Sequence, residues 1–471
     1  MQHIVYEMGS GDILFVKKGY SSSEKMTVER AGAMFPDKKV GIWRIGDRFI
    51  DVKANKIALD AKGEPRGIIL YEGEGILDMS PVEKSPDAKR IIYKGVFMDH
   101  GGYANMNREI ALRLSAKRDI DMKIEVVPSG KQVSDEIYKR LMSIARSYVN
   151  PKNAVNIIGF TPMQTDLSNF NVFFTMMEPE TLHPSFKNLC NKFSDHIFTP
   201  TQWNKEMFIR GGIKKPIHVI PLGIDEKIYQ NKEIKRLPIL CRELPARNGP
   251  VAPSKGFNFI TLFGWSYRKG IDVLLKSYCN AFTGNDDVGL IICSRYMGGS
   301  DLKSKSKVES DILKFMSEYD NPPTVYYYGD STPVASMPNL LKNGDCFVWT
   351  SRGEGFGLPV CEAGALEIPV ISSFNSGMTE FLNKDNSFLV ETDKFVVADR
   401  NIDCISPYYV GQLFPQLGKP AINKFSELMR YVYNNYGEAK IKGKKFSEEI
   451  FEKYTWTVCA EKVFEVIGKI K

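Results

Sequence analysis

The sequence predicts an α/β fold with two domains built from alternating strands and helices. Two series of short apolar runs carry this prediction, one over residues 90–223 and one over 257–373, and stretches at helical spacing separate the runs. Strands that are apolar throughout are typical of parallel sheets with helices on both faces. The Pro- and Gly-rich stretch CRELPARNGPVAPSKG lies between the two series and has no apolar periodicity, so we expect a linker over 229–256.

The composition is that of a globular chain with two or three domains. It has 471 residues, of which 43% are hydrophobic and 25% charged. Its eight cysteines are scattered without a CxxC pair, which favours a reducing compartment over disulfides or a zinc site. The N-terminus has no signal-peptide pattern, and no run approaches the ~18 apolar residues of a membrane span. These features predict a cytoplasmic protein.

The net charge of +7 is compatible with peripheral contact at the inner face of a membrane. It does not indicate nucleic-acid binding, because the densest basic patch, FIRGGIKKP, has no interleaved aromatic residues. A surface with a small excess of lysine explains the charge equally well. Nothing in the sequence indicates a particular oligomeric state.

Residues 1–88 differ from the rest of the chain. The stretch 47–73 alternates in short runs around Ala-Asn and Lys-Gly-Glu-Pro turns, which is typical of β-hairpins. We therefore predict an appended α+β module, to which the sequence assigns no role.

The first apolar series predicts a βα-repeating domain over 89–228. It starts with the strand-length run RIIYKGVF, and a turn at Gly101 and Gly102 leads into the helical pattern NMNREIALRLSA. This strand–turn–helix order opens a βαβ unit. Further strands are expected at 123–128, 153–160, 171–177, 195–200 and 217–223.

The second series predicts another such domain over 257–440, followed by C-terminal helices over 441–471. The run FNFITLFGW should be its first strand, and a helix is expected at 270–282. The remaining strands are expected at 288–295, 324–330, 346–350 and 369–373.

A Gly-rich turn in the second domain predicts a phosphate site. In CFVWTSRGEGFGLPVCEAGAL a strand leads through a loop into a helix with Pro359 near its start. Glycines let the backbone approach a ligand, and the first amides of a helix bind anions. Glu354 and Glu362 flank this turn, and carboxylates accept hydrogen bonds from hydroxyl groups. A nucleotide-sugar would satisfy all three elements, although the two acids could also be surface residues or a glycosidase acid/base pair.

A second signal is the stretch FGWSYRKGIDVLLKSY. Arg268 and Lys269 lie where a helix should begin, and cations at that end oppose the helix dipole unless an anion is present. A diphosphate leaving group would be such an anion. The alternative is a pair of solvated surface charges.

These motifs resemble the retaining glycosyltransferases of family four, whose GT-B fold sets two Rossmann-like domains across a cleft. The likeness covers 90–471, and its E-x7-E motif is Glu354 and Glu362. WSYRKGIDVLL is similar to the RKG block of one subgroup, and 174–225 is similar to the end of the family's first domain. YTWTVCAEKV is similar to the family's last helix, which crosses back to the first domain.

The resemblance implies transfer of a hexose from a nucleoside-diphosphate-sugar to a hydroxyl of a carbohydrate, lipid-linked, protein or small-molecule acceptor. Configuration is retained by same-face attack, with no metal or other cofactor. Arg268 and Lys269 would hold the diphosphate, Glu354 would contact the transferred sugar, and Glu362 the ribose. Further donor contacts are implied for the Gly101–Gly102 loop and for Gly355, Phe356, Gly357 and Leu358.

Two positions depart from the family pattern. Many members have Gly-Arg where this chain has Gly264-Trp265, so the arginine role must fall to Arg268. Glu367 stands where a helix-ending glycine is usual, and a left-handed cap without glycine costs about 1 kcal/mol.

Three residues of the first domain are candidates for the acceptor side. His100 adjoins the Gly-Gly turn, Glu178 ends a strand, and His183 follows shortly after. A lone histidine is also a common packing or capping residue. The D-x-D pattern in RDIDM lies in a helix–strand turn, so we predict no metal site there.

Rival functions fit the sequence less well. A dehydrogenase needs G-x-G-x-x-G and an acid after the next strand, and the chain has HGGYANMN followed by VVPSG. A nucleotide-sugar epimerase or a non-catalytic nucleotide-sugar-binding protein remains the alternative.

Overall fold

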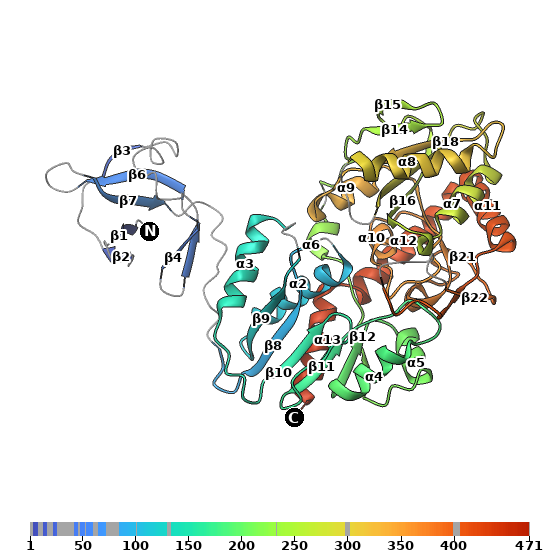
Figure 1. Ribbon diagram of the computed structural model, residues 1–471. Coiled ribbons are helices and arrows are strands. Elements are labelled where there is room, and N and C mark those ends of the chain that lie inside the picture. The colour runs from blue at the N-terminus through green and yellow to red at the C-terminus, as the bar shows by residue number, and fades with distance from the viewer. Residues whose placement is uncertain are drawn as a thin grey trace. The chain divides into compact units, whose positions relative to one another are not determined.

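The chain divides into two compact units, Met1–Ser85 and Pro86–Lys471. The computed structural model describes strands within 3–71, and residues 84–99, 101–129, 133–231, 233–296, 302–398 and 406–470 (Figure 1).

The first unit forms antiparallel β-structure where it is described. Strands β6 (Lys53–Leu59) and β7 (Pro65–Tyr71) pair as a hairpin, which confirms the hairpin predicted within 47–73. They belong to a sheet of order β2-β1-β7-β6-β3, and β4 pairs with β5 separately. The helical part of the predicted α+β module lies outside the described residues. The other strands are β1 (His3–Glu7), β2 (Ile13–Val16), β3 (Ser22–Lys25), β4 (Ile42–Ile45) and β5 (Arg48–Asp51).

The second unit begins with a six-stranded parallel sheet of order β13-β12-β11-β10-β8-β9. Its strands are the apolar runs predicted from the sequence, and helices connect most of them, as expected for a sheet covered on both faces. The strands are β8 (Lys89–Val96), β9 (Ile120–Val127), β10 (Val155–Gly159), β11 (Phe170–Phe174), β12 (His196–Thr199) and β13 (Ile217–Val219). The helices are α2 (Gly102–Ser115), α3 (Asp135–Arg146), α4 (Pro184–Phe193), α5 (Gln202–Arg210) and α6 (Glu226–Tyr229).

The second sheet of this unit has the order β15-β14-β18-β17-β16-β19-β20-β21. The six strands from β18 to β21 are parallel, and their central members are buried along nearly their whole length. The strands are β16 (Phe257–Trp265), β17 (Val288–Tyr296), β18 (Thr324–Tyr328), β19 (Cys346–Trp349), β20 (Val370–Ser373) and β21 (Phe388–Val390). The helices are η1 (Tyr267–Lys269), α7 (Ile271–Ala281), α8 (Leu302–Met316), η2 (Val334–Ser336), α9 (Met337–Leu341), α10 (Leu358–Ala365) and η3 (Ser376–Glu380).

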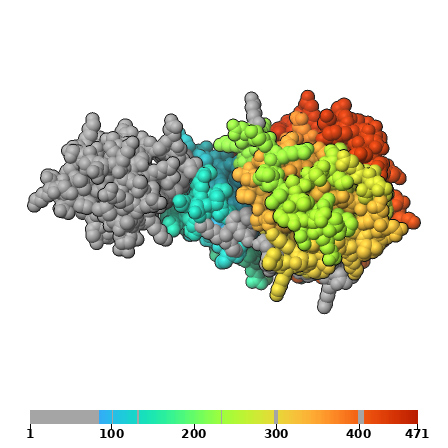
Figure 2. Space-filling view, turned by 90° about the horizontal axis from the view of Figure 1, so that it is seen from above, coloured from blue at the N-terminus to red at the C-terminus, as the bar shows by residue number. Residues whose placement is uncertain are grey.

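The linker prediction was wrong for part of 229–256. Strands β14 (Cys241–Leu244) and β15 (Asn248–Val251) form a hairpin, and β14 pairs antiparallel with β18 at the edge of the second sheet. In Figure 2 these yellow-green residues lie against yellow residues of the second domain. An edge strand tolerates proline, because one side of its backbone has no strand to pair with.

The C-terminal helices serve both domains. Helix α12 (Tyr436–Lys453) packs on α10, where Phe446 occupies the space beside Gly364, so the crossing does not begin at 441 as predicted. It begins after α12, where the Trp456 amide donates to the Ile224 carbonyl and the Ile224 amide donates to the Tyr454 carbonyl. Helix α13 (Trp456–Lys469) then packs against α2 of the first domain (Figure 1). Helix α11 (Lys419–Asn434) precedes them and packs on α7.

Within the described part of the chain, no helix is long and apolar enough to cross a bilayer.

Candidate functional site

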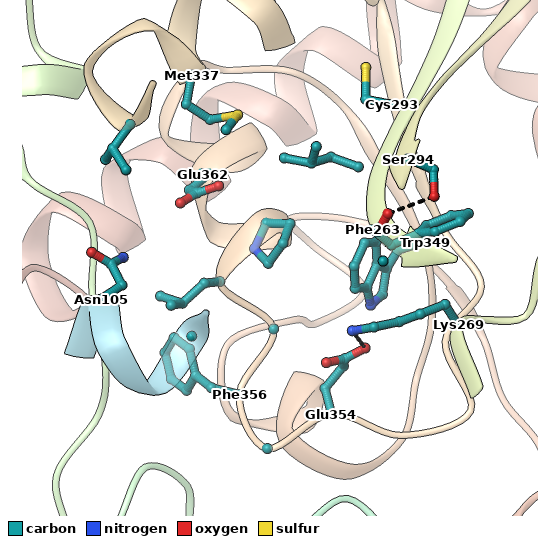
Figure 3. Close-up of a pocket in the computed structure, with 18 of the residues that line it drawn as sticks. Asn105, Phe263, Lys269, Cys293, Ser294, Met337, Trp349, Glu354, Phe356 and Glu362 are labelled. Carbon is teal, nitrogen blue, oxygen red and sulfur yellow. Dashed lines mark hydrogen bonds and ion pairs between the residues drawn. The ribbon is translucent and has the colours of Figure 1, made fainter. Parts of the chain in front are cut away.

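A cavity of about 490 Å³ opens between the two sheet domains. Gly102, Tyr103 and Arg108 of the first domain line it together with the turns that follow β16 and β19 of the second. This is the edge of an open α/β sheet at which ligands usually bind, beyond the carboxyl ends of the parallel strands. Figure 3 shows Lys269 and Glu354 on one side of the cavity and Glu362 on another.

The Gly-rich turn enters helix α10 as predicted. Its N-cap, Gly357, has a φ of 106°, a left-handed conformation that favours glycine, and it has no side chain to cap the helix. Pro359 occupies the first turn, where a missing N–H costs little. Gly355, Phe356, Gly357 and Leu358 all line the cavity, but the Phe356 side chain is buried against Phe381. Only backbone groups of this turn are therefore suited to hold an anion.

Arg268 and Lys269 lie in η1, immediately before α7. Lys269 Nζ is 2.6 Å from Glu354 Oε1, and Arg268 Nη1 is 3.5 Å from the same oxygen. Arg268 also donates to the Gly353 carbonyl at 2.5 Å. The two cations expected near the start of this helix thus face a carboxylate of the chain itself.

The charges of this cluster perturb one another. Burial opposes ionisation of Glu354, but Lys269, Arg268 and a 2.6 Å hydrogen bond from Ser351 hold its pKa below the ordinary value. Burial lowers the pKa of Lys269, and the Glu354 carboxylate opposes that shift. The pair is almost fully buried, with 14% of the Lys269 side chain and 10% of the Glu354 side chain exposed. A ligand with negative charge would compete directly with Glu354 for these two cations.

Several supporting residues were not found from the sequence. Arg352 forms a bidentate pair with Asp272 at 2.9 and 2.8 Å and stacks on Tyr267, which ties the Gly-rich loop to η1 and α7. The ring of Trp349 lies 5.0 Å from Lys269 Nζ. Their places in the sequence are the signal that could have identified them. Arg352 adjoins the Glu354–Glu362 motif, and Asp272 follows the Arg-Lys-Gly stretch.

Glu362 projects from α10 into the cavity below Met337 (Figure 3). Burial raises its pKa to about 7, and the neighbouring Tyr229 phenol opposes the shift. Unlike Glu354, it therefore changes charge near neutral pH.

The first domain contributes the loop after β8. Buried Arg108 donates to the carbonyls of Phe97 and Asp99, and the Asp99 carboxylate accepts from the Gly101 amide at 2.7 Å. Gly101 is the N-cap of α2, and Gly102 lines the cavity. His100 lies outside the described residues.

The other two acceptor-side candidates have different surroundings. Glu178 lines the cavity and accepts a 2.6 Å hydrogen bond from Tyr409. Burial raises its pKa, and Arg268 and Tyr409 oppose this. His183 instead caps α4, accepting from the Ser185 amide at 3.2 Å, and contacts the Tyr408 ring. The structure therefore brings Glu178 to the cavity but assigns His183 a capping role.

Glu367 adopts the left-handed conformation predicted for it. Its φ is 60°, directly after α10, and its amide donates to the Gly364 carbonyl at 2.9 Å. It lies away from the cavity between the domains and lines a second, smaller one.

Parts of this chain are similar in sequence to known proteins. Residues 247–406 match the family model "Glycosyl transferases group 1". A probable sucrose-phosphate synthase of Thermosipho melanesiensis is 24% identical over 307 residues, 60% of this chain and 57% of that protein. The capsular polysaccharide biosynthesis glycosyltransferase CapM of Staphylococcus aureus is 29% identical over 176 residues, 36% of this chain and 43% of CapM. The chain thus spans about half the length of these curated relatives.

Solved structures share the fold. Anabaena HepE, in complex with UDP-glucose, superposes with a TM-score of 0.54 at 14% identity, over 81% of this chain and all of HepE. At that identity the likeness shows the fold alone. This chain therefore has the GT-B fold, and the family match over residues 247–406 supports a group 1 glycosyltransferase of the family-four type.

Proposed function

We propose that this chain is a retaining hexosyltransferase that uses a nucleoside-diphosphate-sugar. The observation that carries the proposal is the convergence of three elements on one cavity. These are the uncapped start of α10, the Arg268–Lys269 pair, and Glu362. They match the phosphate, charge and hydroxyl groups of such a donor.

The donor would lie across the second domain. Backbone amides at Gly355–Leu358 would hold phosphate and sugar oxygens, because the first amides of a helix lack partners within it. Glu362 would accept hydrogen bonds from ribose hydroxyls, and Glu354 from the transferred sugar. UDP-glucose is bound by the similarly folded HepE, so UDP-hexoses are the first donors to test.

Charge stabilisation would supply most of the catalysis. As the bond between sugar and diphosphate breaks, negative charge develops on the leaving phosphate oxygen. Arg268 and Lys269, fixed in a water-poor site, would stabilise it without a metal ion. That oxygen would take the proton of the attacking hydroxyl on the same face of the sugar, so that configuration is retained.

The acceptor would approach from the first domain. Glu178, Tyr103 and the Gly102 loop line that side of the cavity. We propose a hydroxyl of a carbohydrate, lipid-linked, protein or small-molecule acceptor, with Glu178 as its hydrogen-bond partner.

The test is a donor panel of UDP-, GDP- and ADP-hexoses with and without EDTA. Release of nucleoside diphosphate that survives EDTA and is lost in Arg268→Ala supports the proposal. Binding without release indicates a nucleotide-sugar-binding protein, and conversion to another nucleotide-sugar without release indicates an epimerase.

A further inference from the structure

A hairpin of the second domain reaches onto the first domain. Strands β22 (Phe395–Val397) and β23 (Leu413–Pro415) pair antiparallel after β21, on the side that faces α4 and α5 (Figure 1). We call residues 395–398 and 406–415 the clasp. The clasp residues Ala398, Tyr409 and Phe414 are buried in an apolar core that otherwise belongs to the first domain, with Phe173, Met177, Phe186 and Phe208 among its members.

The clasp is also hydrogen-bonded to the chain that follows β11. The Glu180 amide donates to the Leu413 carbonyl at 2.8 Å, and the Leu413 amide donates to Thr181 Oγ1 at 2.9 Å. These bonds lie two and three residues beyond Glu178, whose carboxylate lines the cavity. The clasp therefore holds the segment that carries Glu178.

Tyr409 connects the clasp to the cavity itself. Its hydroxyl donates to Glu178 Oε2 at 2.6 Å, and the Arg268 guanidinium lies 5.9 Å from its ring centre. One tyrosine thus contacts an acid of the first domain and a cation of the second, and both line the cavity. Tyr409 and Glu178 are 231 positions apart in sequence, and they meet because the clasp packs on the first domain.

We propose that Tyr409 is a positioning residue that orients the Glu178 carboxylate toward the acceptor. A hydrogen bond to Oε2 fixes the plane of the carboxylate and leaves Oε1 able to accept from the attacking hydroxyl. A positioned partner holds the nucleophile close to its reactive geometry, and a small misplacement lowers the rate strongly. This inference rests on the proposed transferase function and adds a specific residue to its acceptor side.

The proposed role belongs to the hydroxyl of Tyr409 and not to its ring, so the two can be tested separately. Tyr409→Phe keeps the ring in the apolar core and removes the hydroxyl that donates to Glu178. Tyr408→Phe is the matched control, because Tyr408 belongs to the same clasp and packs through its ring on His183 and Phe186. Water serves as the acceptor probe, with the sugar nucleotide that the wild-type chain hydrolyses fastest among UDP-, GDP- and ADP-glucose.

We expect Tyr409→Phe to lower kcat about tenfold, because the loss of one hydrogen bond to a charged group changes a rate by about that factor. The Kd of the nucleoside diphosphate, measured by calorimetry, should not change, and Tyr408→Phe should behave as wild type. In a Glu178→Ala background Tyr409→Phe should have no further effect, because its partner is gone. Thermal unfolding checks that every variant is folded, and Glu178→Leu, which also cannot accept a hydrogen bond, replaces Glu178→Ala if the latter is not folded.

The outcomes are distinct. Equal rates for Tyr409→Phe and Tyr408→Phe in an active enzyme overturn the role of Tyr409 and leave the transferase function intact. An additive loss in the Glu178→Ala background also overturns it, because Tyr409 would then act independently of Glu178. A wild-type chain that hydrolyses none of the donors overturns the proposed function and the role of Tyr409 with it.

Discussion

Lys269 Nζ and Glu354 Oε1 are 2.6 Å apart in the wall of the interdomain cavity. The two residues are 85 positions apart in sequence, and the pair joins the turn after β16 to the turn after β19. The same two residues are the ones we assign to the diphosphate and the transferred sugar. Glu354 thus offsets part of the charge of Arg268 and Lys269 in the free protein, and a donor would have to share these cations with it or displace it.

Glu354→Gln should destabilise the free protein. The variant leaves the buried Lys269 without its anion, and breaking a buried pair in this way costs about 3 kcal/mol. The lowered pKa of Glu354 means that its contribution is present above the ordinary carboxyl pKa and is lost as pH falls through the folded-state pKa. Urea unfolding should therefore show a gap between wild type and variant at neutral pH that narrows in acid.

A surface pair provides the control for that experiment. Lys424 and Glu427 are 3.3 Å apart with both side chains more than half exposed. Glu427→Gln should change stability by less than about 1 kcal/mol. If Glu354→Gln is equally mild, the buried pair does not stabilise the site as we describe.

Arg268→Ala should lower the rate much more than it weakens nucleotide binding. Removing one preorganised charge from a developing oxyanion costs about 10²–10³ in kcat. The measurement is nucleotide-sugar turnover together with calorimetric Kd of the nucleoside diphosphate. Lys303→Ala removes a positive charge from the exposed face of α8 and should be silent. If Arg268→Ala and Lys303→Ala lower turnover to a similar degree, the effect would come from the overall positive charge of the protein and not from the position of Arg268.

Nucleotide binding should strengthen as pH rises through neutrality. Glu362 has a pKa raised to about 7 by burial, so it is largely neutral in mild acid and ionised in mild base. The ionised form accepts hydrogen bonds from both ribose hydroxyls, which predicts an affinity gain of about tenfold between about pH 6 and pH 8. Glu362→Gln is the control, because the phosphates of the ligand titrate equally with both proteins. Its plot of affinity against pH should lack this gain.

The same shift predicts an opposite trend in stability. A carboxyl whose folded-state pKa is raised binds its proton more tightly in the folded protein, so stability falls as pH rises toward about 7. Glu362→Gln should lose this part of the pH dependence of unfolding. Identical profiles in wild type and variant would contradict the assigned pKa.

Gly353→Ala should disturb the contact between the domains. A Cβ at Gly353 would lie 2.6 Å from the Glu178 carbonyl oxygen, a backbone atom that cannot move aside by itself. We expect lower thermal stability and a raised KM for the donor. Gly437→Ala is the control, since a Cβ at this exposed first-turn position meets nothing within 4 Å, and alanine favours a helix by about 1 kcal/mol. Wild-type behaviour of Gly353→Ala would mean that the domains are not held together at this point.

Most of the fold could be predicted because its strands are buried on both faces. Runs such as FNFITLFGW and VGLIICSRY are apolar over nearly their whole length, and in the structure they are the central strands β16 and β17. The left-handed conformation of Glu367 followed from the family resemblance, in which a helix-ending glycine is usual at that position. In contrast, β14 is directly followed by Pro245 and β15 contains Pro250, and this hairpin lies at the edge of the sheet, where apolar patterning is weak.

The candidate site was predictable where it is local in sequence. Glu354 to Glu362 form one strand–turn–helix unit, so their relation to the cavity follows from a short stretch. The partners of that unit come from distant segments, and no local pattern joins Arg352 to Asp272 or Tyr409 to Glu178. The sequence also did not reveal which anion pairs with Lys269, because the Lys269–Glu354 pair depends on how two turns meet in three dimensions.

The most direct test of the central claim is the anomeric form of the sugar released from an α-linked nucleotide-glucose by the wild-type chain. Proton NMR recorded faster than mutarotation should show α-glucose first, together with free nucleoside diphosphate, in the presence of EDTA. Lys269→Met should abolish both signals. Initial release of β-glucose, or no release from any donor of the panel, would contradict the account of a retaining, metal-independent transferase.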